Sequence, residues 1–231
     1  MRFKVLIPQT FLERAFAGMR YLVVAMLFLT GAAGQPAAEG RGVKLVVLGD
    51  SLVAGYGLEP GQAFPEKLEA ALTAKGHDVT IVNAGVSGDT SAGGLERLDW
   101  SVPEDADAVI VELGANDALR GIDPATTRAN LDAIVTRLKA RGTAIVLAGM
   151  LAPPNMGPDY EAAFNPVYGD LARAHDVALY PFFLDGVAAQ PSLNLSDGMH
   201  PNPDGVEVIV ARFLPVAEQL LQQIAGRAVA K

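Results

Sequence analysis

Cysteine is absent from the 231-residue chain, and histidine occurs only three times. Without cysteine the chain has no disulfide framework, no thiol nucleophile and no zinc site with thiolate ligands. Three histidines also leave little for a histidine-rich metal centre. An oxidising compartment would therefore impose no disulfide pairing on this chain, because it contains no thiol to oxidise.

Positive charge is also scarce, because 18 lysine and arginine residues stand against 26 aspartate and glutamate residues, a net charge of −8. Without a basic patch, nucleic acid and anionic membranes are not expected as partners. Half of the residues are hydrophobic, which excludes a disordered chain. A chain of this length is most simply one domain with a sizeable core.

An apolar run near the N-terminus, Tyr21–Ala33, is too short to span a bilayer comfortably, since a spanning helix needs about 20 residues. It follows basic residues and ends in small residues, as a signal peptide does. We therefore expect a signal peptide over residues 1–34 and a protein that is periplasmic or secreted. Cleavage after Ala38, a true start at Met19 and an uncleaved membrane anchor are the alternatives.

The domain expected over residues 43–226, after a short flexible segment at 35–42, alternates apolar runs with amphipathic stretches. Near-continuous apolar strands between helices indicate a parallel sheet covered on both faces. The sequence therefore predicts an α/β protein, a three-layer α/β/α sandwich. The expected strands are Val43–Gly49, Val79–Asn83, Ala108–Leu113, Ala144–Met150 and Val177–Tyr180. The expected helices are Pro65–Lys75, Gly94–Leu98, Thr126–Arg141, Tyr160–His175 and Asp204–Ile224.

Small and polar residues follow four of the expected strands. In a parallel α/β sheet the carboxyl ends of the strands share one rim, and ligands bind there. The loops after these strands should therefore meet. They contain Gly49-Asp50-Ser51, Asn83–Asp89, Gly114–Asp117 and Ser196–Pro201.

Ser51 is the candidate nucleophile at this rim. A serine hydroxyl attacks a carbonyl only when a base removes its proton, and the base needs an acid to orient it. Asp197 and His200 lie three residues apart in the stretch DGMHP, so one loop presents a carboxylate and an imidazole together. We predict His200 as the general base toward Ser51 and Asp197 as its partner. A purely structural loop is the alternative for so short a motif.

Acyl transfer also needs hydrogen-bond donors aimed at the developing oxyanion. The candidates are the backbone N–H of Ser51, the backbone N–H of Gly85 and the side-chain amide of Asn116. A turn glycine and a loop-capping asparagine are the alternatives for the last two. Asp50 is expected to cap the helix that follows the turn. The G-x-S-x-G elbow of α/β-hydrolases is absent around both Ser51 and Ser87, which favours a different scaffold.

Four sequence blocks together resemble those of the SGNH (GDSL) hydrolase family. They are GDSL at Gly49–Leu52, Gly85 within NAGVSGDTS, Asn116 within LGANDALRG, and DGMHPN at Asp197–Asn202. Their spacing is most similar to the periplasmic multifunctional thioesterase I, lysophospholipase L1 and arylesterase group. The similarity runs from about Lys44 to Leu221.

This resemblance implies a flavodoxin-like sandwich with five parallel strands, and a serine esterase without metal or organic cofactor. It implies Ser51 as nucleophile, with Asp197 and His200 completing the triad. Gly85 and Asn116 are then oxyanion donors beside the N–H of Ser51. The implied substrates are small acyl esters and thioesters, namely aryl and short-chain esters, lysophospholipids and acyl-CoA. We expect a monomer with no nucleic-acid partner and no stable membrane anchor after signal cleavage.

The loop Leu151–Phe164 occupies the place where the similar enzymes line an acyl groove. Met156, Tyr160 and Phe164 are candidate groove residues, with packing of a helix start on the sheet as the alternative. A carbohydrate O-acetylesterase is the alternative enzyme, although this proline-rich loop is more apolar than a sugar site requires. A flavodoxin-like binding module is the other alternative, but Gly49–Gly57 contains no Lys or Arg for a phosphate cradle.

Overall fold

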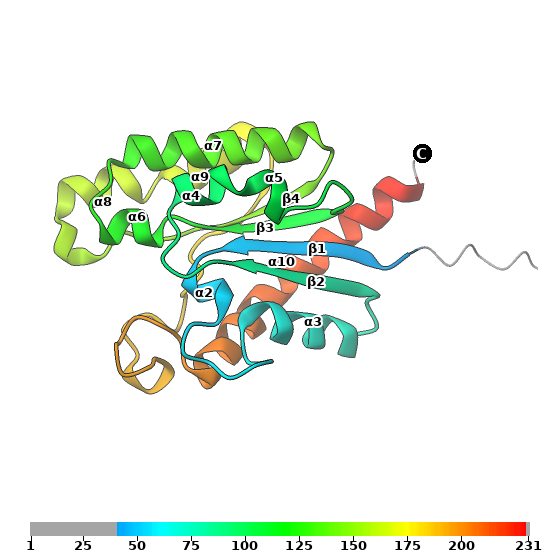
Figure 1. Cartoon of the computed structure of the whole chain (residues 1–231), viewed down its shortest axis with the longest axis horizontal. Coiled ribbons are helices and arrows are strands. Elements are labelled where there is room, and N and C mark those ends of the chain that lie inside the picture. The colour runs from blue at the N-terminus through cyan, green and yellow to red at the C-terminus, as the bar shows by residue number, and fades with distance from the viewer. Residues whose placement is uncertain (1–40, 230–231) are drawn as a thin grey trace, which may run out of the picture. The chain divides into compact units, whose positions relative to one another are not determined.

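The computed structural model describes residues 41–229, which contain a five-stranded sheet whose strands all run parallel (Figure 1). The strand order is β2-β1-β3-β4-β5. The expected signal peptide lies outside the described residues. The strands are β1 (Val43–Gly49), β2 (Val79–Gly85), β3 (Ala108–Glu112), β4 (Ala144–Ala148) and β5 (Ala178–Tyr180).

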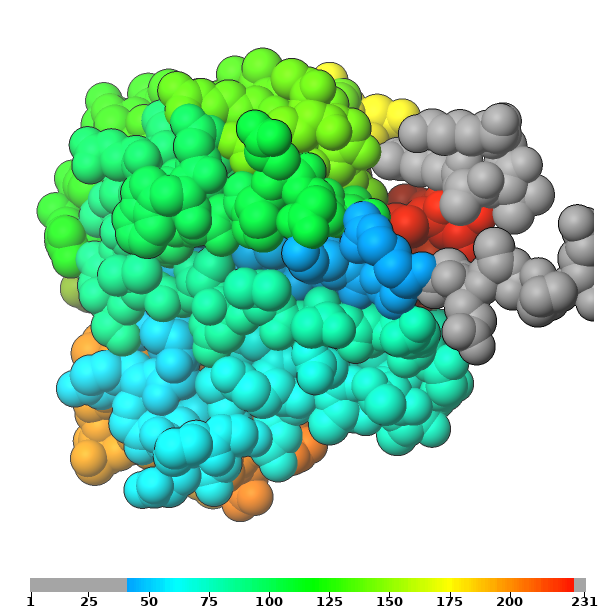
Figure 2. Space-filling view, turned by 45° about the vertical axis from the view of Figure 1, so that its right-hand side comes forward, coloured from blue at the N-terminus to red at the C-terminus, as the bar shows by residue number. Residues whose placement is uncertain are grey.

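Helices cover both faces of this sheet, which confirms the predicted three layers (Figure 1). One face carries α2 (Ser51–Ala54), α3 (Phe64–Ala74) and α10 (Pro203–Val229). The other carries α4 (Ser91–Glu96), α5 (Leu98–Ser101), α6 (Ala115–Leu119), α7 (Pro124–Ala140), α8 (Pro158–Phe164) and α9 (Val167–His175). Two 3₁₀ turns lie at Pro154–Met156 and Pro191–Leu193. Between the two helical layers β1 is seen only as a blue strip (Figure 2). No helix of residues 41–229 is long and apolar enough to cross a membrane.

The register of the three strands β2, β1 and β3 brings their carboxyl ends to one level. Gly49 at the end of β1 lies opposite Gly85 on one side and Glu112 on the other. The segments that follow these strands therefore begin side by side, as the sequence predicted for the rim. This alignment positions the site described below.

One expected helix, Tyr160–His175, is wrong as a single element. The structure divides it into α8 and α9, with a turn at residues 165–166. Pro166 explains the break, because proline has no N–H to donate to the preceding helical turn. The rim segment Gly114–Asp117, expected as a loop, also differs, since it opens the short helix α6.

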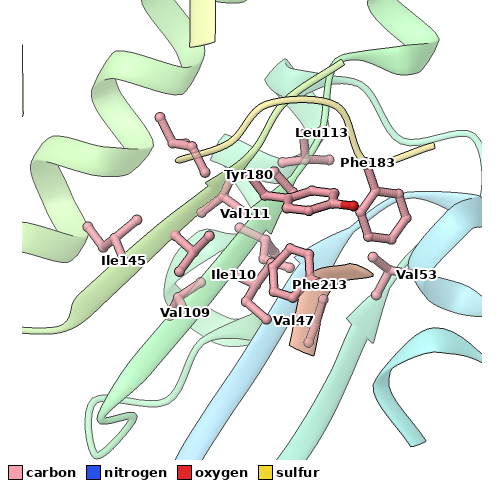
Figure 3. Close-up of a cluster of buried hydrophobic side chains, with 14 of the residues drawn as sticks. Val47, Val53, Val109, Ile110, Val111, Leu113, Ile145, Tyr180, Phe183 and Phe213 are labelled. Atoms are coloured by element: carbon pink, nitrogen blue, oxygen red, sulfur yellow. The ribbon is translucent and has the colours of Figure 1, made fainter. Parts of the chain in front are cut away.

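Aromatic rings fill the core between the sheet and α10 (Figure 3). The ring of Phe213 in α10 has its centroid 5.3 Å from that of Phe64 and 4.8 Å from that of Tyr180. Phe64 in turn packs edge-on against Phe183 at 5.0 Å. Such tilted and edge-on pairs are the favoured aromatic geometries. They join α3, α10 and the segment after β5 into one apolar cluster.

Phe213→Ala should lower the free energy of unfolding by about 3–5 kcal/mol, because a cavity replaces the contacts of a fully buried ring. Urea-induced unfolding followed by circular dichroism measures the loss. Trp100→Ala is the matched control, since 76% of Trp100 is exposed, and it should change the free energy by no more than about 0.5 kcal/mol. Equal losses in the two variants would contradict this account of the core.

Candidate active site

Ser51 lies at the sharp turn between β1 and α2. Asp50 caps α2, because its Oδ1 accepts a hydrogen bond from the backbone N–H of Leu52 at 3.0 Å. The expected helix cap is therefore confirmed. Gly49 has no room for a side chain, since a Cβ there would lie 2.3 Å from the side chain of Val53. Close packing of the strand end on α2 thus defines the position of Ser51.

His200 and Asp197 meet Ser51 from a loop that precedes α10. The Nε2 atom of His200 lies 2.9 Å from Ser51 Oγ, and its Nδ1 atom lies 2.7 Å from Asp197 Oδ2. The loop is closed by the N–H of Leu195, which donates to the carbonyl of His200 at 2.8 Å. Gly198 within it has a φ of +69°, a left-handed conformation that favours glycine. The structure thus brings together the three residues that the sequence predicted as a triad.

The Asp197 carboxylate is held in its ionised form. The backbone N–H groups of His200 and Met199 both donate to its Oδ1, at 3.0 and 2.9 Å. These bonds, and then the His200 ring, lower the pKa of Asp197 from 3.8 to about 2. With Asp197 ionised, Nδ1 of His200 carries a proton and Nε2 is left to accept from Ser51.

The lowered pKa also sets a pH window for stability. A carboxylate whose pKa is depressed by folding stabilises the native state above its unfolded pKa. For Asp197 that contribution is complete above about pH 3.8 and is lost as the pH falls through about 2. The loop geometry is therefore maintained across the neutral range.

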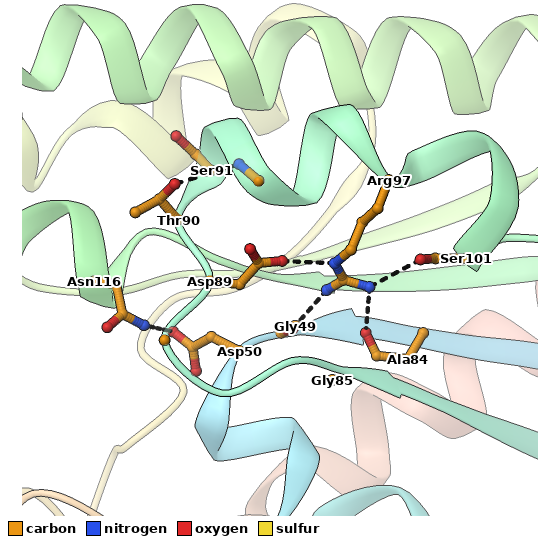
Figure 4. Close-up of polar contacts among 12 residues, drawn as sticks. Gly49, Asp50, Ala84, Gly85, Asp89, Thr90, Ser91, Arg97, Ser101 and Asn116 are labelled. Atoms are coloured by element: carbon orange, nitrogen blue, oxygen red, sulfur yellow. Dashed lines mark hydrogen bonds and ion pairs between the residues drawn. The ribbon is translucent and has the colours of Figure 1, made fainter.

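Asn116 lies at the start of α6 and points toward the Ser51 turn (Figure 4). Its Nδ2 donates to Asp50 Oδ2 at 2.9 Å. An amide group carries two N–H donors, so the second remains for another acceptor. Asp50 therefore orients Asn116 while it caps the helix that begins at Ser51.

The geometry of Gly85 does not support its expected role as an oxyanion donor. Gly85 lies opposite Gly49, and the next residue, Val86, donates its N–H to the Gly49 carbonyl at 3.0 Å. Because successive N–H groups of a strand point to opposite sides, the N–H of Gly85 points away from β1. It donates to Asn83 Oδ1 at 3.0 Å. Glycine is needed here for packing, since a Cβ would lie 2.3 Å from the backbone nitrogen of Ala54.

Gly88 occupies the tight turn that follows β2. The N–H of Asp89 donates to the carbonyl of Val86 at 3.1 Å, which closes the turn, and Gly88 has a φ of +82°. Its carbonyl accepts from the guanidinium of Arg120 at 2.7 Å, which ties it to the residue that follows α6. Within residues 41–229, no hydrogen bond from the N–H of Gly88 is seen. This donor was not singled out in the sequence, although NAGVSGDTS contains it.

Arg97 is a buried residue of the site that the sequence did not reveal (Figure 4). Its guanidinium donates to the carbonyls of Gly49 and Ala84, both at 2.8 Å, and to Ser101 Oγ at 3.0 Å. Its Nε donates to Asp89 Oδ2 at 2.6 Å. One side chain thus joins the end of β1, the end of β2 and the turn after β2. The sequence signal is weak, an arginine eight residues after an aspartate.

Glu112 is a second buried residue with an ionisable side chain that the sequence did not reveal. It ends β3 with no exposed surface, and its Oε2 accepts from the backbone N–H of Asp50 at 3.3 Å. Burial, and then the nearby Asp50, raises the pKa of Glu112 well above its usual range. Its sequence signal is an acid that ends an otherwise apolar run, AVIVE. In the described chain, no three histidine, aspartate or glutamate residues gather as a metal site would require.

The three expected groove residues differ in burial and in contacts. Phe164 is fully buried and packs against Tyr160 and Tyr168, so it offers no surface to a substrate. Tyr160 is partly buried against the core, and its hydroxyl donates to the carbonyl of Ile122 at 2.7 Å. Met156 is half-buried in a 3₁₀ turn.

Exposed apolar side chains instead lie beside His200 and in the segments that follow the strands. The Tyr56 ring packs at a tilt against the His200 ring, with 4.5 Å between centroids, and Tyr56 is 53% exposed. Four further exposed hydrophobic residues come from the segments after β2, β3 and β4 and from the His200 loop. They are Val86, Leu119, Leu151 and Met199.

Comparison with known families identifies the family of this chain. A model of the GDSL-like Lipase/Acylhydrolase family matches residues 47–208. The chain therefore belongs to this family of ester-hydrolysing enzymes, and the resemblance found in the four sequence blocks is confirmed.

Individual relatives extend the similarity over most of the chain. An arylesterase of Vibrio mimicus is 39% identical over 207 residues, which cover 89% of this chain and 100% of the relative. The thioesterase 1/protease 1/lysophospholipase L1 of Escherichia coli K12 is 40% identical over 161 residues, 69% of this chain and 76% of the relative. The crystal structure of TesA superposes with a TM-score of 0.73 at 40% identity, covering 77% of this chain and 99% of that one.

Replacing Arg97 by methionine should lower the free energy of unfolding by about 3–5 kcal/mol, because the Asp89 carboxylate, only 14% exposed, and the carbonyls of Gly49 and Ala84 lose the donor that Arg97 supplies. Thermal unfolding of the variant measures the loss. Arg128→Met is the control, since Arg128 pairs with Asp170 at 2.9 Å on the surface, where a pair contributes about 0–1 kcal/mol. If both variants lost the same small amount, Arg97 would not hold the strand ends together.

Proposed function

We propose that the chain is an exported serine esterase that hydrolyses acyl esters and thioesters through an acyl-enzyme intermediate. The observation that carries this proposal is the continuous hydrogen-bonded series of the triad. Ser51 Oγ lies 2.9 Å from His200 Nε2, and Asp197 lies 2.7 Å from His200 Nδ1. This is the order of contacts by which a serine hydroxyl is activated.

In the acylation step His200 Nε2 takes the hydroxyl proton while Ser51 Oγ bonds to the substrate carbonyl carbon. The carbonyl oxygen becomes an oxyanion, which fixed hydrogen-bond donors stabilise. The intermediate then collapses, and the bond to the alcohol or thiol breaks. The leaving group takes the proton from His200, and the acyl group remains on Ser51.

In the deacylation step His200 takes a proton from a water molecule, whose oxygen attacks the acyl carbon. The bond between this carbon and Ser51 Oγ breaks, and Ser51 recovers its proton from His200. The free acid leaves, and the enzyme returns to its starting state. Asp197 stays ionised throughout and stabilises the imidazolium that forms twice in each cycle.

Three donors suit the oxyanion in this proposal. They are the backbone N–H of Ser51, the second N–H of the Asn116 amide and the N–H of Gly88. Gly88 replaces Gly85 because the N–H of Gly85 is already bonded to Asn83. The carbonyl of Gly88 accepts from Arg120, the residue that follows α6, and α6 contains Asn116. This contact supports the proposal that Gly88 and Asn116 donate to the same oxyanion.

The exposed apolar residues near the triad support a substrate with an apolar acyl chain. Aryl and short-chain esters, lysophospholipids and acyl-CoA thioesters fit this requirement, in line with the names of the relatives. No specific observation favours a carbohydrate O-acetylesterase, and a binding module would leave the triad contacts without a use. We propose export, to the periplasm or beyond, from the N-terminal sequence alone.

A fluorophosphonate probe followed by intact-mass analysis tests the proposed nucleophile. We expect one adduct on the wild-type protein and none on Ser51→Ala, because only an activated serine reacts. Ser87→Ala is the matched control, an exposed serine in the turn after β2, and it should keep the adduct. An unlabelled wild-type protein with native circular dichroism would contradict the proposal. A panel of esters and thioesters of increasing acyl length then defines the substrate.

The phosphonyl adduct also tests the oxyanion donors, since its oxygen occupies the oxyanion position. Amide ¹⁵N–¹H spectra of the free and labelled enzyme compare the two glycines directly. We expect the proton resonances of Gly88 and Ser51 to move downfield on labelling, because both N–H groups gain the strongly accepting phosphoryl oxygen. The Gly85 resonance should stay in place. The reverse pattern would return Gly85 to the oxyanion site and remove Gly88.

A further inference from the structure

Glu112 is a fully buried acid that lies beneath the nucleophile turn and has no part in the mechanism above. A Cβ added to Gly49 would lie 2.8 Å from its Oε2, so the carboxyl group lies directly against the end of β1. Tyr168 lies close to Glu112, because its hydroxyl donates to the carbonyl of the next residue, Leu113, at 2.7 Å. The other carboxyl oxygen, Oε1, has no hydrogen-bond partner among the described residues.

An ionised Glu112 would be costly in this place. A buried carboxylate needs hydrogen-bond donors on both oxygens, and an oxygen without one raises the free energy of the charged form. Asp50 is also fully buried and adjoins Glu112. Two buried carboxyl groups in contact do not both ionise near neutral pH, so the pair retains one proton.

The donors around the pair decide which residue carries that proton. The Asp50 carboxylate accepts from the N–H of Leu52 and from Asn116, and both bonds favour its charged form. Glu112 accepts only the long contact from the N–H of Asp50. The proton therefore belongs to Glu112, whose pKa is raised well above its usual range by burial and then by Asp50.

The other charged or titratable groups near the pair agree with this assignment. Burial raises the pKa of Asp50, but the hydrogen bonds from the Leu52 N–H and the Asn116 amide oppose this rise. The Arg97 guanidinium donates to the Gly49 carbonyl next to Asp50. The Arg97 guanidinium thus puts a fixed positive charge next to Asp50, which favours the charged form of Asp50. The pKa of Tyr168 is raised well above its usual range by burial and then by the nearby acids Glu112, Asp117 and Asp50, so Tyr168 is neutral beside the pair.

We propose that Glu112 is a positioning residue that acts as a neutral acid, with its O–H donating to the Asp50 carboxylate. Asp50 is thereby kept ionised and in place, and it orients the Asn116 amide for the oxyanion. This inference rests on the proposed function, because it assigns Asn116 to the oxyanion. A charged Glu112 would drive the proton onto Asp50 and weaken its hold on Asn116.

Two variants of similar volume separate a neutral donor from a required charge. Glu112→Gln keeps a neutral donor, so we expect it to retain most of the wild-type kcat and the wild-type pH–rate profile. Glu112→Leu removes the donor and should lower kcat on the order of tenfold with KM unchanged, less than the 10²–10³-fold that losing a whole oxyanion donor costs. A Gln variant as impaired as the Leu variant would overturn the proposal.

A double-mutant cycle with Asn116→Ala shows whether the effect passes through Asn116. If Glu112 acts by holding Asp50 and Asn116, the Leu substitution should have little further effect on kcat once the amide is gone. A merely structural loss would lower kcat by the same factor in both backgrounds. That additive result would contradict the positioning role.

Infrared spectroscopy measures the protonation state without relying on activity. We expect the wild-type protein at neutral pH to show the carbonyl stretch of a protonated carboxyl group that is missing from Glu112→Gln. Identical spectra would mean that Glu112 is ionised and would overturn the inference even if Ser51 reacts with the fluorophosphonate. Conversely, an unreactive Ser51 with the carboxyl band present would contradict the proposed function and leave the protonation state established.

Discussion

The carboxylate of Asp50 is the contact on which the geometry of this site depends, because it joins three elements at once. It caps the helix that begins at Ser51, it accepts from Asn116 of α6, and it lies against Glu112 at the end of β3. A buried carboxylate is tolerated only where donors replace the lost water. Each donor to Asp50 thus makes the burial of its carboxylate possible and also restrains the geometry of the site. Ser51 and the neighbouring Asn116 amide are oriented by the same group.

Below the rim, the ends of the parallel strands create a second need for donors. The carbonyl groups of Gly49 and Ala84 would otherwise face the interior without a further donor. The Arg97 guanidinium donates a hydrogen bond to each of them. The site therefore has a polar floor that is closely hydrogen-bonded, while apolar side chains such as Tyr56 and Met199 are exposed beside the triad. This division suits the proposed function, in which the reacting groups are fixed and the acyl chain meets apolar surface.

Local patterns predicted the sheet and the triad residues because both depend on short-range sequence. An apolar run such as Val43–Gly49 is buried in any parallel sheet, and Asp197 and His200 share one short loop. Prediction failed where distant parts of the chain decide the outcome. The helix expected through Pro166 was inferred from apolar periodicity, which takes no account of the missing N–H of proline. Phe164 is buried in part by Tyr168 from the next helix. Arg97 and Glu112 resemble ordinary charged residues until the fold encloses them.

The sequence by itself determined the class of fold and the family, and it predicted Ser51, His200 and Asp197 as the reacting groups. It also marked Gly85 as a position that needs glycine, but the reason lies in the tertiary structure. Only the strand pairing shows that its N–H points away from β1, since the direction of a backbone N–H depends on which neighbour the strand bonds. The tertiary structure likewise decided which acids are buried and which donors reach them. Burial and hydrogen bonding at this site come from segments more than sixty residues apart, as between Asp50 and Asn116, and no local pattern encodes such contacts.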